Sequence, residues 1–221
     1  MARVNDIMKF LVISDIHAND AAIDWVNDRI VQFDVDAVMV LGDVTHFGPV
    51  QWALDFLVAL KAPAYVIPGN CDPLDLPPAI SAVAIDMHGK SKKMPGFTLV
   101  GLGGSNPTIF NTPFELSEKE IDQKLSVISS SEMILMVHTP PYGVHDEIPS
   151  GINVGSTALA KIIRKFKPRA VLSGHIHEAR GLIEMDGTLF MNPGPAKDGY
   201  AALLEIGAET VKGELLDPLP N

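Results

Sequence analysis

Five short apolar runs recur along the chain. Each has four or five residues, many of them branched, and none alternates regularly between apolar and polar positions. Near-continuous runs of this kind are typical of strands buried on both faces, as in the parallel sheets of α/β proteins. We predict strands at Phe10–Ser14, Ala37–Leu41, Ala64–Ile67, Met133–Val137 and Ala170–Ser173.

Segments with helical periodicity lie between these runs. In Asn19–Val31 apolar residues recur on one helical face, and Asn19 suits the N-cap position. Pro49–Leu60 has a similar face with a proline in its first turn, and Ser117-Glu-Lys-Glu120 has the form of a capping box. Ser156–Lys167 combines an apolar stripe with basic residues that complement the C-terminal end of the helix dipole. This alternation of strands and helices predicts an α/β fold.

The last quarter of the chain changes to strands and turns. Residues 182–185 and 188–191 flank Asp186-Gly187, which favours a tight hairpin turn. Further strands at about 200–206 and 210–215 are expected to complete a second sheet. Because no linker, repeat or low-complexity tract interrupts the pattern, we expect one domain over residues 1–221.

Polar side chains with metal-binding chemistry follow each of the five predicted strands. Ligands at the carboxyl ends of such strands gather along one edge of a sheet, where open α/β sheets bind ligands. In Asp15-x-His17 and His175-x-His177 the spacing of two residues puts both side chains on one side of an extended segment. The seven candidate donors are Asp15, His17, Asp43, Asn70, His138, His175 and His177.

The chemistry of the seven donors restricts the metal. Carboxylate, imidazole and amide oxygen suit divalent manganese, iron, zinc or nickel, whereas copper or an iron–sulfur cluster would require thiolates. Seven protein ligands are too many for one catalytic ion that keeps an open position, but they suit two ions that share a bridging carboxylate. We therefore expect two divalent transition-metal ions, with manganese first among these candidates.

The ordered motifs D-x-H, G-D, G-N-x-[ED], H and G-H-x-H resemble those of the calcineurin-like metallophosphoesterase family, from Lys9 to about Val211. The resemblance implies a sandwich of two mixed β-sheets flanked by helices. It also implies hydrolysis of a small phosphodiester or phosphomonoester through in-line attack of a metal-bridging hydroxide. By the family's pattern, one metal is held by Asp15, His17 and His177 and the other by Asn70, His138 and His175, while Asp43 bridges them.

The motif Gly69-Asn70-Cys71-Asp72 departs from the family. Many members have histidine at the position of Cys71, and that histidine is thought to protonate the leaving alcohol or contact the phosphate. The thiol of Cys71 either takes over this catalytic role as a weaker donor or packs as a small apolar group. Asp72 either orients its neighbours through hydrogen bonds or caps the turn at Pro73.

Three residues are candidates for substrate binding. His46 follows Asp43 by three residues, Asn106 lies in a glycine-rich loop, and His145 follows the Pro140-Pro-Tyr-Gly segment. Loops at 103–116 and 139–155 are longer than ordinary connections, so we expect them to wall the substrate pocket. His88, in a predicted strand remote from the donors, is expected to be structural or exposed.

Composition limits the partners. With 27 acidic and 17 basic residues the formal net charge is −10, so a long nucleic acid would be repelled. The basic group Lys90–Lys93 is expected to be a solvated hairpin turn. The single cysteine suits a reducing compartment, and residues 1–6 lack the apolar stretch of a signal peptide. We expect a soluble cytoplasmic enzyme with a small phosphate-ester substrate and no membrane partner. The alternative is a non-catalytic or weakly catalytic interaction scaffold, as in the retromer subunit of this family.

Overall fold

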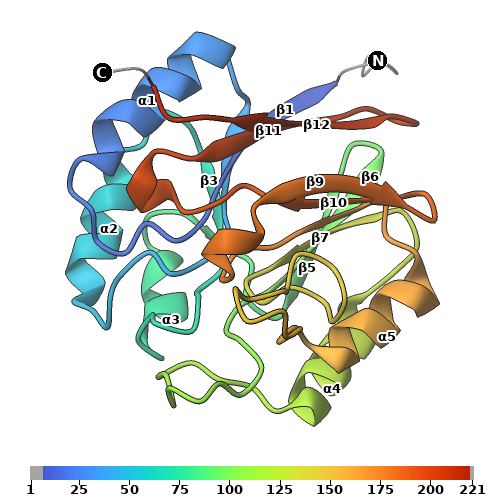
Figure 1. Cartoon of the computed structure of the whole chain (residues 1–221). Helices are drawn as coiled ribbons and strands as arrows, with labels where there is room; N and C mark the ends of the chain where they lie inside the picture. The colour runs from blue at the N-terminus through green and yellow to red at the C-terminus, as the bar shows by residue number, and fades with distance from the viewer. Residues whose placement is uncertain (1–6, 220–221) are drawn as a thin grey trace.

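The computed structural model describes residues 7–219, which form two stacked six-stranded sheets with helices on their outer faces (Figure 1). The first sheet contains, in spatial order, β12 (Val211–Leu216), β11 (Ala201–Ile206), β1 (Met8–Ile13), β2 (Ala37–Val40), β3 (Ala64–Val66) and β4 (Ile85–Asp86). The second contains β5 (Lys90–Met94), β6 (Phe97–Leu102), β7 (Met133–Val137), β8 (Ala170–Leu172), β10 (Thr188–Asn192) and β9 (Gly181–Met185). Both sheets are mixed, so the predicted fold class is confirmed.

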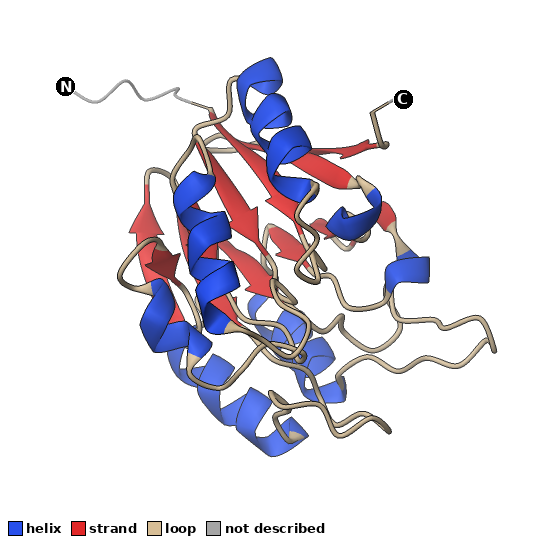
Figure 2. Cartoon of the chain, turned by 90° about the vertical axis from the view of Figure 1, so that its left-hand side faces the viewer, coloured by secondary structure: helices blue, strands red, loops and turns tan. Residues whose placement is uncertain are grey.

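The core has three layers. Helices α1 (Ala22–Phe33), α2 (Val50–Ala59) and α3 (Leu76–Ile80) pack on the first sheet, and α4 (Glu118–Ile128) and α5 (Thr157–Phe166) pack on the second. A third cluster fills the space between the two sheets. Figure 2 shows the helices outside the strands. Because central strands have apolar neighbours on both sides, their sequences are apolar at successive positions.

Parallel pairing sets the direction of the central strands. β1, β2, β3 and β4 run parallel in the first sheet, and β6, β7, β8 and β10 run parallel in the second. In the first sheet β11 pairs antiparallel with β1, and β12 pairs antiparallel with β11. In the second sheet the edge strands β5 and β9 pair antiparallel with β6 and β10. The segments that follow β1, β2, β3, β7 and β8 carry the seven donors, so the fold brings them to one region.

The structure confirms all five predicted strands and corrects their grouping. β1 to β3 belong to the first sheet, whereas β7 and β8 belong to the second. The strands predicted near residues 200–206 and 210–215 do not complete the second sheet, because β11 pairs with β1 in the first. The Asp186-Gly187 hairpin is confirmed, and both of its turn residues have positive φ.

Some predicted helix ends are shifted. α1 begins at Ala22 and its N-cap is Ala21, not Asn19 as predicted. Asn19 instead accepts a 3.0 Å hydrogen bond from the N–H of Ala21 in the turn before the helix. Pro49 is the N-cap of α2 rather than a residue of its first turn. The capping box at Ser117 and Glu120 is confirmed.

Two other expectations concern charge and targeting. The basic group Lys90–Lys93 lies in strand β5, not in a turn. The segment 1–6, from which we expect no signal peptide, lies outside the described residues. Within residues 7–219 no helix combines the length and apolar character needed to cross a membrane.

Candidate metal centre

Asp15, His17 and His177 form the first group of donors. Asp15 and His17 follow β1, and His177 lies beyond β8 in the other sheet. Nε2 of His17 is 3.4 Å from Nε2 of His177, and the latter nitrogen is 3.4 Å from Oδ1 of Asp15. Among residues 7–219, Oδ1 of Asp15 is buried and has no hydrogen-bond partner. An unpaired buried polar atom is costly, and a cation beside Oδ1 of Asp15 and Nε2 of His17 and His177 would satisfy that oxygen.

Asn70, His138 and His175 form the second group. Nε2 of His138 lies 2.9 Å from Oδ1 of Asn70, and the rings of His138 and His175 have centroids 5.1 Å apart. Nδ1 of His138 is 2.8 Å from the carbonyl oxygen of Leu41, the contact that commonly fixes the ring of a metal-binding histidine. His138 is therefore held with Nε2 directed at the other donors.

Asp43 joins the two groups. Its Oδ1 is 3.4 Å from Nε2 of His138, and its Oδ2 is 3.7 Å from Nε2 of His17. The two oxygens of one buried carboxylate thus face different histidines, an arrangement that suits a bridging ligand. Potential ligand atoms of Asp15, Asp43 and His138 lie within 4.8 Å of one another, as do those of Asp15, His17 and His177.

The electrostatic field at these residues is suited to cations. Burial alone would lower the pKa of His138, but the carboxylates of Asp43 and Asp15 raise it to about 9. Burial would likewise raise the pKa of Asp43, yet the charge of His138 holds it well below its usual range. Burial, together with the charge of His138, lowers the pKa of His175 to about 4. A site that holds a proton between buried carboxylates can exchange it for a metal ion, so the donor set fits divalent cations.

Four of the seven donors have a strained backbone. The φ angles of Asp15, His17, Asp43 and His175 are 57°, 49°, 48° and 68°, in the left-handed region that side chains disfavour. Such residues cost on the order of 1 kcal/mol or more each and cluster at functional sites. Close packing supports them, because a Cβ atom at Gly69 would collide with the carboxylate of Asp43.

Asp72 holds the two loops that carry Asp43 and Asn70. Its Oδ1 accepts hydrogen bonds from the N–H and hydroxyl of Thr45 at 2.7 and 2.9 Å. Its Oδ2 accepts from the N–H groups of Gly69 and Val44 at 2.8 and 3.2 Å. Burial and the charge of Asp43 raise the pKa of Asp72 to about 6. These contacts favour the orienting role over a cap at Pro73.

Cys71 is buried beside the donors. Its N–H donates a 2.8 Å hydrogen bond to Oδ1 of Asp43, and its Sγ belongs to a cluster with His17 and His46. Burial and the charge of Asp43 raise the pKa of the Cys71 thiol, so the sulfur carries a proton at neutral pH. The thiol is therefore close enough for a catalytic role and also buried enough for packing.

The three predicted substrate residues occupy different places. The ring of His46 is exposed, with its centroid 5.4 Å from that of His17, so it borders the donors. Asn106 uses its side chain between loops, donating to the carbonyl of Val154 at 3.1 Å and accepting from the Thr139 hydroxyl at 2.6 Å. The ring of His145 packs against Gly181 of β9. Substrate binding by Asn106 or His145 stays a prediction.

His88 lies in a turn rather than a strand, and its Nδ1 accepts a 3.2 Å hydrogen bond from the N–H of Gly103. Burial lowers its pKa to about 4. Its contacts are structural, as expected.

Thr112 and Glu115 were not among the predicted site residues. The hydroxyl of Thr112 accepts a 3.0 Å hydrogen bond from the side-chain amide of Asn70, which leaves Oδ1 of Asn70 facing His138. Glu115 in turn accepts from the N–H and hydroxyl of Thr112 at 2.9 and 2.8 Å. The loop at 103–116 thus reaches the donors, but threonine in a loop has no sequence pattern that reveals such a contact.

The comparisons with known proteins agree with this geometry. The family model for calcineurin-like phosphoesterases matches residues 8–179. An uncharacterized protein of Methanocaldococcus jannaschii, MJ1162, is 35% identical over 198 residues, which cover 85% of this chain and 88% of that protein. The structure is similar to TT1561 of Thermus thermophilus, with a TM-score of 0.71, 16% identity and coverage of 95% of this chain and 99% of that one.

A dimetal phosphatase from Danio rerio shares the fold with a TM-score of 0.65 and 16% identity, over 95% of this chain and 98% of that one. At these identities the structural likeness shows the fold alone, whereas the family match extends over most of the chain and includes all seven donors. The chain belongs to the calcineurin-like phosphoesterase family.

Proposed function

We propose that this protein uses two divalent metal ions to hydrolyse a small phosphodiester or phosphomonoester. The observation that carries the proposal is the position of Asp43, whose two oxygens face His138 and His17 in separate donor groups. One ion would be held by Asp15, His17 and His177, and the other by Asn70, His138 and His175, with Asp43 shared. Manganese is our first candidate, and iron, zinc and nickel suit the same donors.

When bound, such ions supply Lewis acidity that activates water and offsets the charge of a phosphate group. The residues of the chain keep the donors in place. Asp72 ties the backbone just after Asp43, at Val44 and Thr45, to that of Gly69, and Thr112 fixes the amide of Asn70. We propose that His46, exposed beside His17, contacts the substrate and that the protonated thiol of Cys71 donates to a leaving oxygen.

The proposed substrate is small rather than polymeric. The net charge of −10 opposes binding of a long nucleic acid, and no described helix suits a membrane. The single, buried cysteine is consistent with our proposal that the protein acts in the cytoplasm.

The test is hydrolysis of two nitrophenyl substrates by manganese-loaded protein. We expect release of nitrophenol from bis(p-nitrophenyl) phosphate or p-nitrophenyl phosphate, loss of activity with EDTA, and recovery on adding Mn²⁺. The Asp43→Asn variant keeps the size of the side chain but weakens the shared ligand, so it serves as the inactive control. If metal-loaded wild type and Asp43→Asn release nitrophenol at the same low rate, the proposal fails.

One observation favours the scaffold alternative, namely that Cys71 occupies the position of a histidine in many members. A neutral thiol is a weaker proton donor than imidazolium. The scaffold alternative is supported if the protein binds two metal ions and hydrolyses neither substrate.

A further inference from the structure

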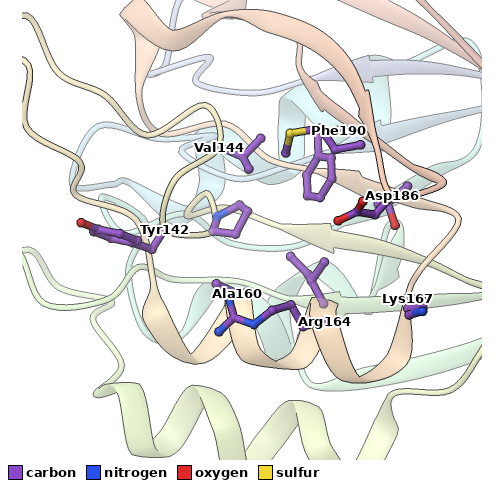
Figure 3. Close-up of a pocket in the computed structure, with 11 residues that line it drawn as sticks. Tyr142, Val144, Ala160, Arg164, Lys167, Asp186 and Phe190 are labelled. Carbon is purple, nitrogen blue, oxygen red and sulfur yellow. The ribbon is translucent and has the colours of Figure 1, made fainter.

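A hollow of about 500 Å³ lies on the outer side of the second sheet (Figure 3). Its walls are α5, the segment that begins at Pro141 and the β9–β10 hairpin. The volume lies within the range of small-molecule sites, which is about 300–1,000 Å³. None of the seven donors lines it, so it is separate from the metal centre.

The floor of the hollow is apolar because the helices do not cover the whole sheet. α4 and α5 pack over the central strands of the second sheet, and the sheet continues beyond α5 to β10 and β9. There Phe190 is 5% exposed, while its β9 partner Ile183 is 43% exposed and Met185 is 37% exposed. Of these three residues Phe190 and Met185 line the hollow, and Pro141, Val144, Ala160 and Ile163 are its other aliphatic lining residues. Apolar surface gathered in a concave place is characteristic of a binding site.

The rim of the hollow is cationic. Arg164 and Lys167 line it, and neither forms an ion pair within residues 7–219. Helix α5 contains Lys161, Arg164 and Lys165 but no acid, although the chain as a whole has a charge of −10. The helix dipole accounts for cations in the last turn. It does not account for the apolar floor opposite them.

Two of the walls, α5 and the segment that begins at Pro141, are tied together. The N–H of Tyr142 donates to the carbonyl of Ser156 at 3.0 Å, and the N–H of Ser156 donates to the carbonyl of Pro140 at 2.9 Å. The hydroxyl of Ser156 caps α5 by accepting from the N–H of Leu159 at 3.1 Å. The hollow is therefore preformed, which lowers the cost of ordering a site when a ligand binds.

We propose that this hollow is a second ligand site, which binds an apolar monocarboxylate. The apolar body packs on Phe190, Val144 and Ile163, and the carboxylate pairs with Arg164 and Lys167. A single negative charge suits the site better than a dianion, because Asp186 is also in the lining. The guanidinium fork of Arg164 matches the two oxygens of a carboxylate.

The test uses octanoate as the probe and octanol as its uncharged counterpart, with binding to the full metal-loaded chain measured by calorimetry. We expect one octanoate to bind per chain and octanol to bind at least about tenfold more weakly. A hydrogen bond to a charged group contributes roughly 1.5–3 kcal/mol, and about 1.4 kcal/mol corresponds to a factor of ten in affinity. The double variant Arg164→Gln, Lys167→Gln should weaken octanoate binding about tenfold and leave octanol binding unchanged.

Two further variants make the test specific. Lys161→Gln, Lys165→Gln removes the same charge from α5 at positions outside the lining, so octanoate binding should be retained. Ala160→Trp fills the hollow from a partly exposed position and should abolish binding of both probes. Absence of saturable octanoate binding, equal losses in the two double variants, or retained binding in Ala160→Trp would each overturn the proposal. None of these readouts depends on phosphoesterase activity.

Discussion

The backbone N–H of Cys71 donates a 2.8 Å hydrogen bond to Oδ1 of Asp43. The bond uses only the main chain of Cys71, so it survives a change of side chain at position 71. The sulfur can therefore be replaced without releasing the carboxylate that joins the two donor groups. This separation makes position 71 suitable for testing proton donation independently of metal binding.

We predict that Cys71→His makes hydrolysis less dependent on the leaving group. Assistance by a general acid contributes roughly 10²–10⁴-fold, and it matters most for alcohols that leave poorly. Wild type should hydrolyse nitrophenyl esters far faster than alkyl esters, and the variant should narrow that difference. The measurement is the slope of log rate against leaving-group pKa for both proteins. Equal slopes, with the variant folded and metal-loaded, would show that Cys71 has a packing role only.

We predict that the protein binds close to two transition-metal ions per chain. Asp43 faces His138 of one donor group and His17 of the other, and the seven side chains would leave open positions on two ions. Elemental analysis after loading and desalting measures the stoichiometry. A value that stays below one ion per chain would contradict the two-ion centre.

Asp43→Ala and His138→Ala should each reduce hydrolysis by about 100-fold or more. In the proposed centre, loss of Asp43 would remove the shared ligand and leave two cations to repel each other, while loss of His138 would remove a fixed nitrogen donor. Rates on a nitrophenyl ester, measured with variants of confirmed folding, test the expectation. His88→Ala is the control and should retain nearly full activity, because its contacts lie with Gly103. Wild-type rates in Asp43→Ala would contradict the assignment.

Asp72→Asn should lower the free energy of unfolding by about 1–3 kcal/mol. The amide nitrogen of asparagine cannot accept the hydrogen bonds that Oδ2 of Asp72 receives from Val44 and Gly69, so buried N–H groups lose their partner. Urea denaturation of the metal-free protein measures the change. Asp75→Asn, at an exposed position three residues later, is the matched control and should change stability little. Equal free energies of unfolding for Asp72→Asn and Asp75→Asn would argue against the orienting role of Asp72.

Stability should fall in acid partly because of His88. In the folded chain burial lowers the pKa of His88 to about 4, whereas the unfolded value is about 6.5. Between these values the unfolded chain binds the extra proton. The contribution of His88 to the free energy of unfolding is therefore complete above about pH 6.5. It is lost as the pH falls toward 4, and the loss amounts to up to about 3 kcal/mol. Urea denaturation at pH 7.5 and 4.5 measures how far the free energy of unfolding falls between these pH values. The fall should be smaller for His88→Asn than for wild type, and an identical fall would contradict the prediction.

The strands were predictable because complete burial leaves a simple apolar pattern. The same property concealed the sheet to which each strand belongs. β2 buries Val38 on one face and Met39 on the other, and β7 in the other sheet buries Leu135 and Met136 in the same way. The pairing of β11 with β1 depends on contacts between residues nearly 200 positions apart, such as Leu11 and Leu203. No local pattern records such a pairing.

The donors were predictable because they occur as motifs at strand ends, and their convergence followed from strand direction. Contacts from irregular segments were not predictable. Thr112 reaches Asn70 through a loop, and the side chain of Asn106, which suits a ligand contact by its type, is used between two loops. Asn19 resembled a helix cap in sequence, but its oxygen is used by the turn before α1.

Asp15, His17, Asp43 and Asn70 follow strands of the first sheet, whereas His138, His175 and His177 follow strands of the second. Ions held by both sets would act as a clamp across the sandwich. Ions that bind only the folded chain stabilise it by about 2.7 kcal/mol when free metal exceeds the dissociation constant a hundredfold. Resistance to thermal unfolding and to proteolysis would then rise and fall with the supply of metal. Scarcity of the metal would change the abundance of the protein as well as the fraction of its sites that hold metal.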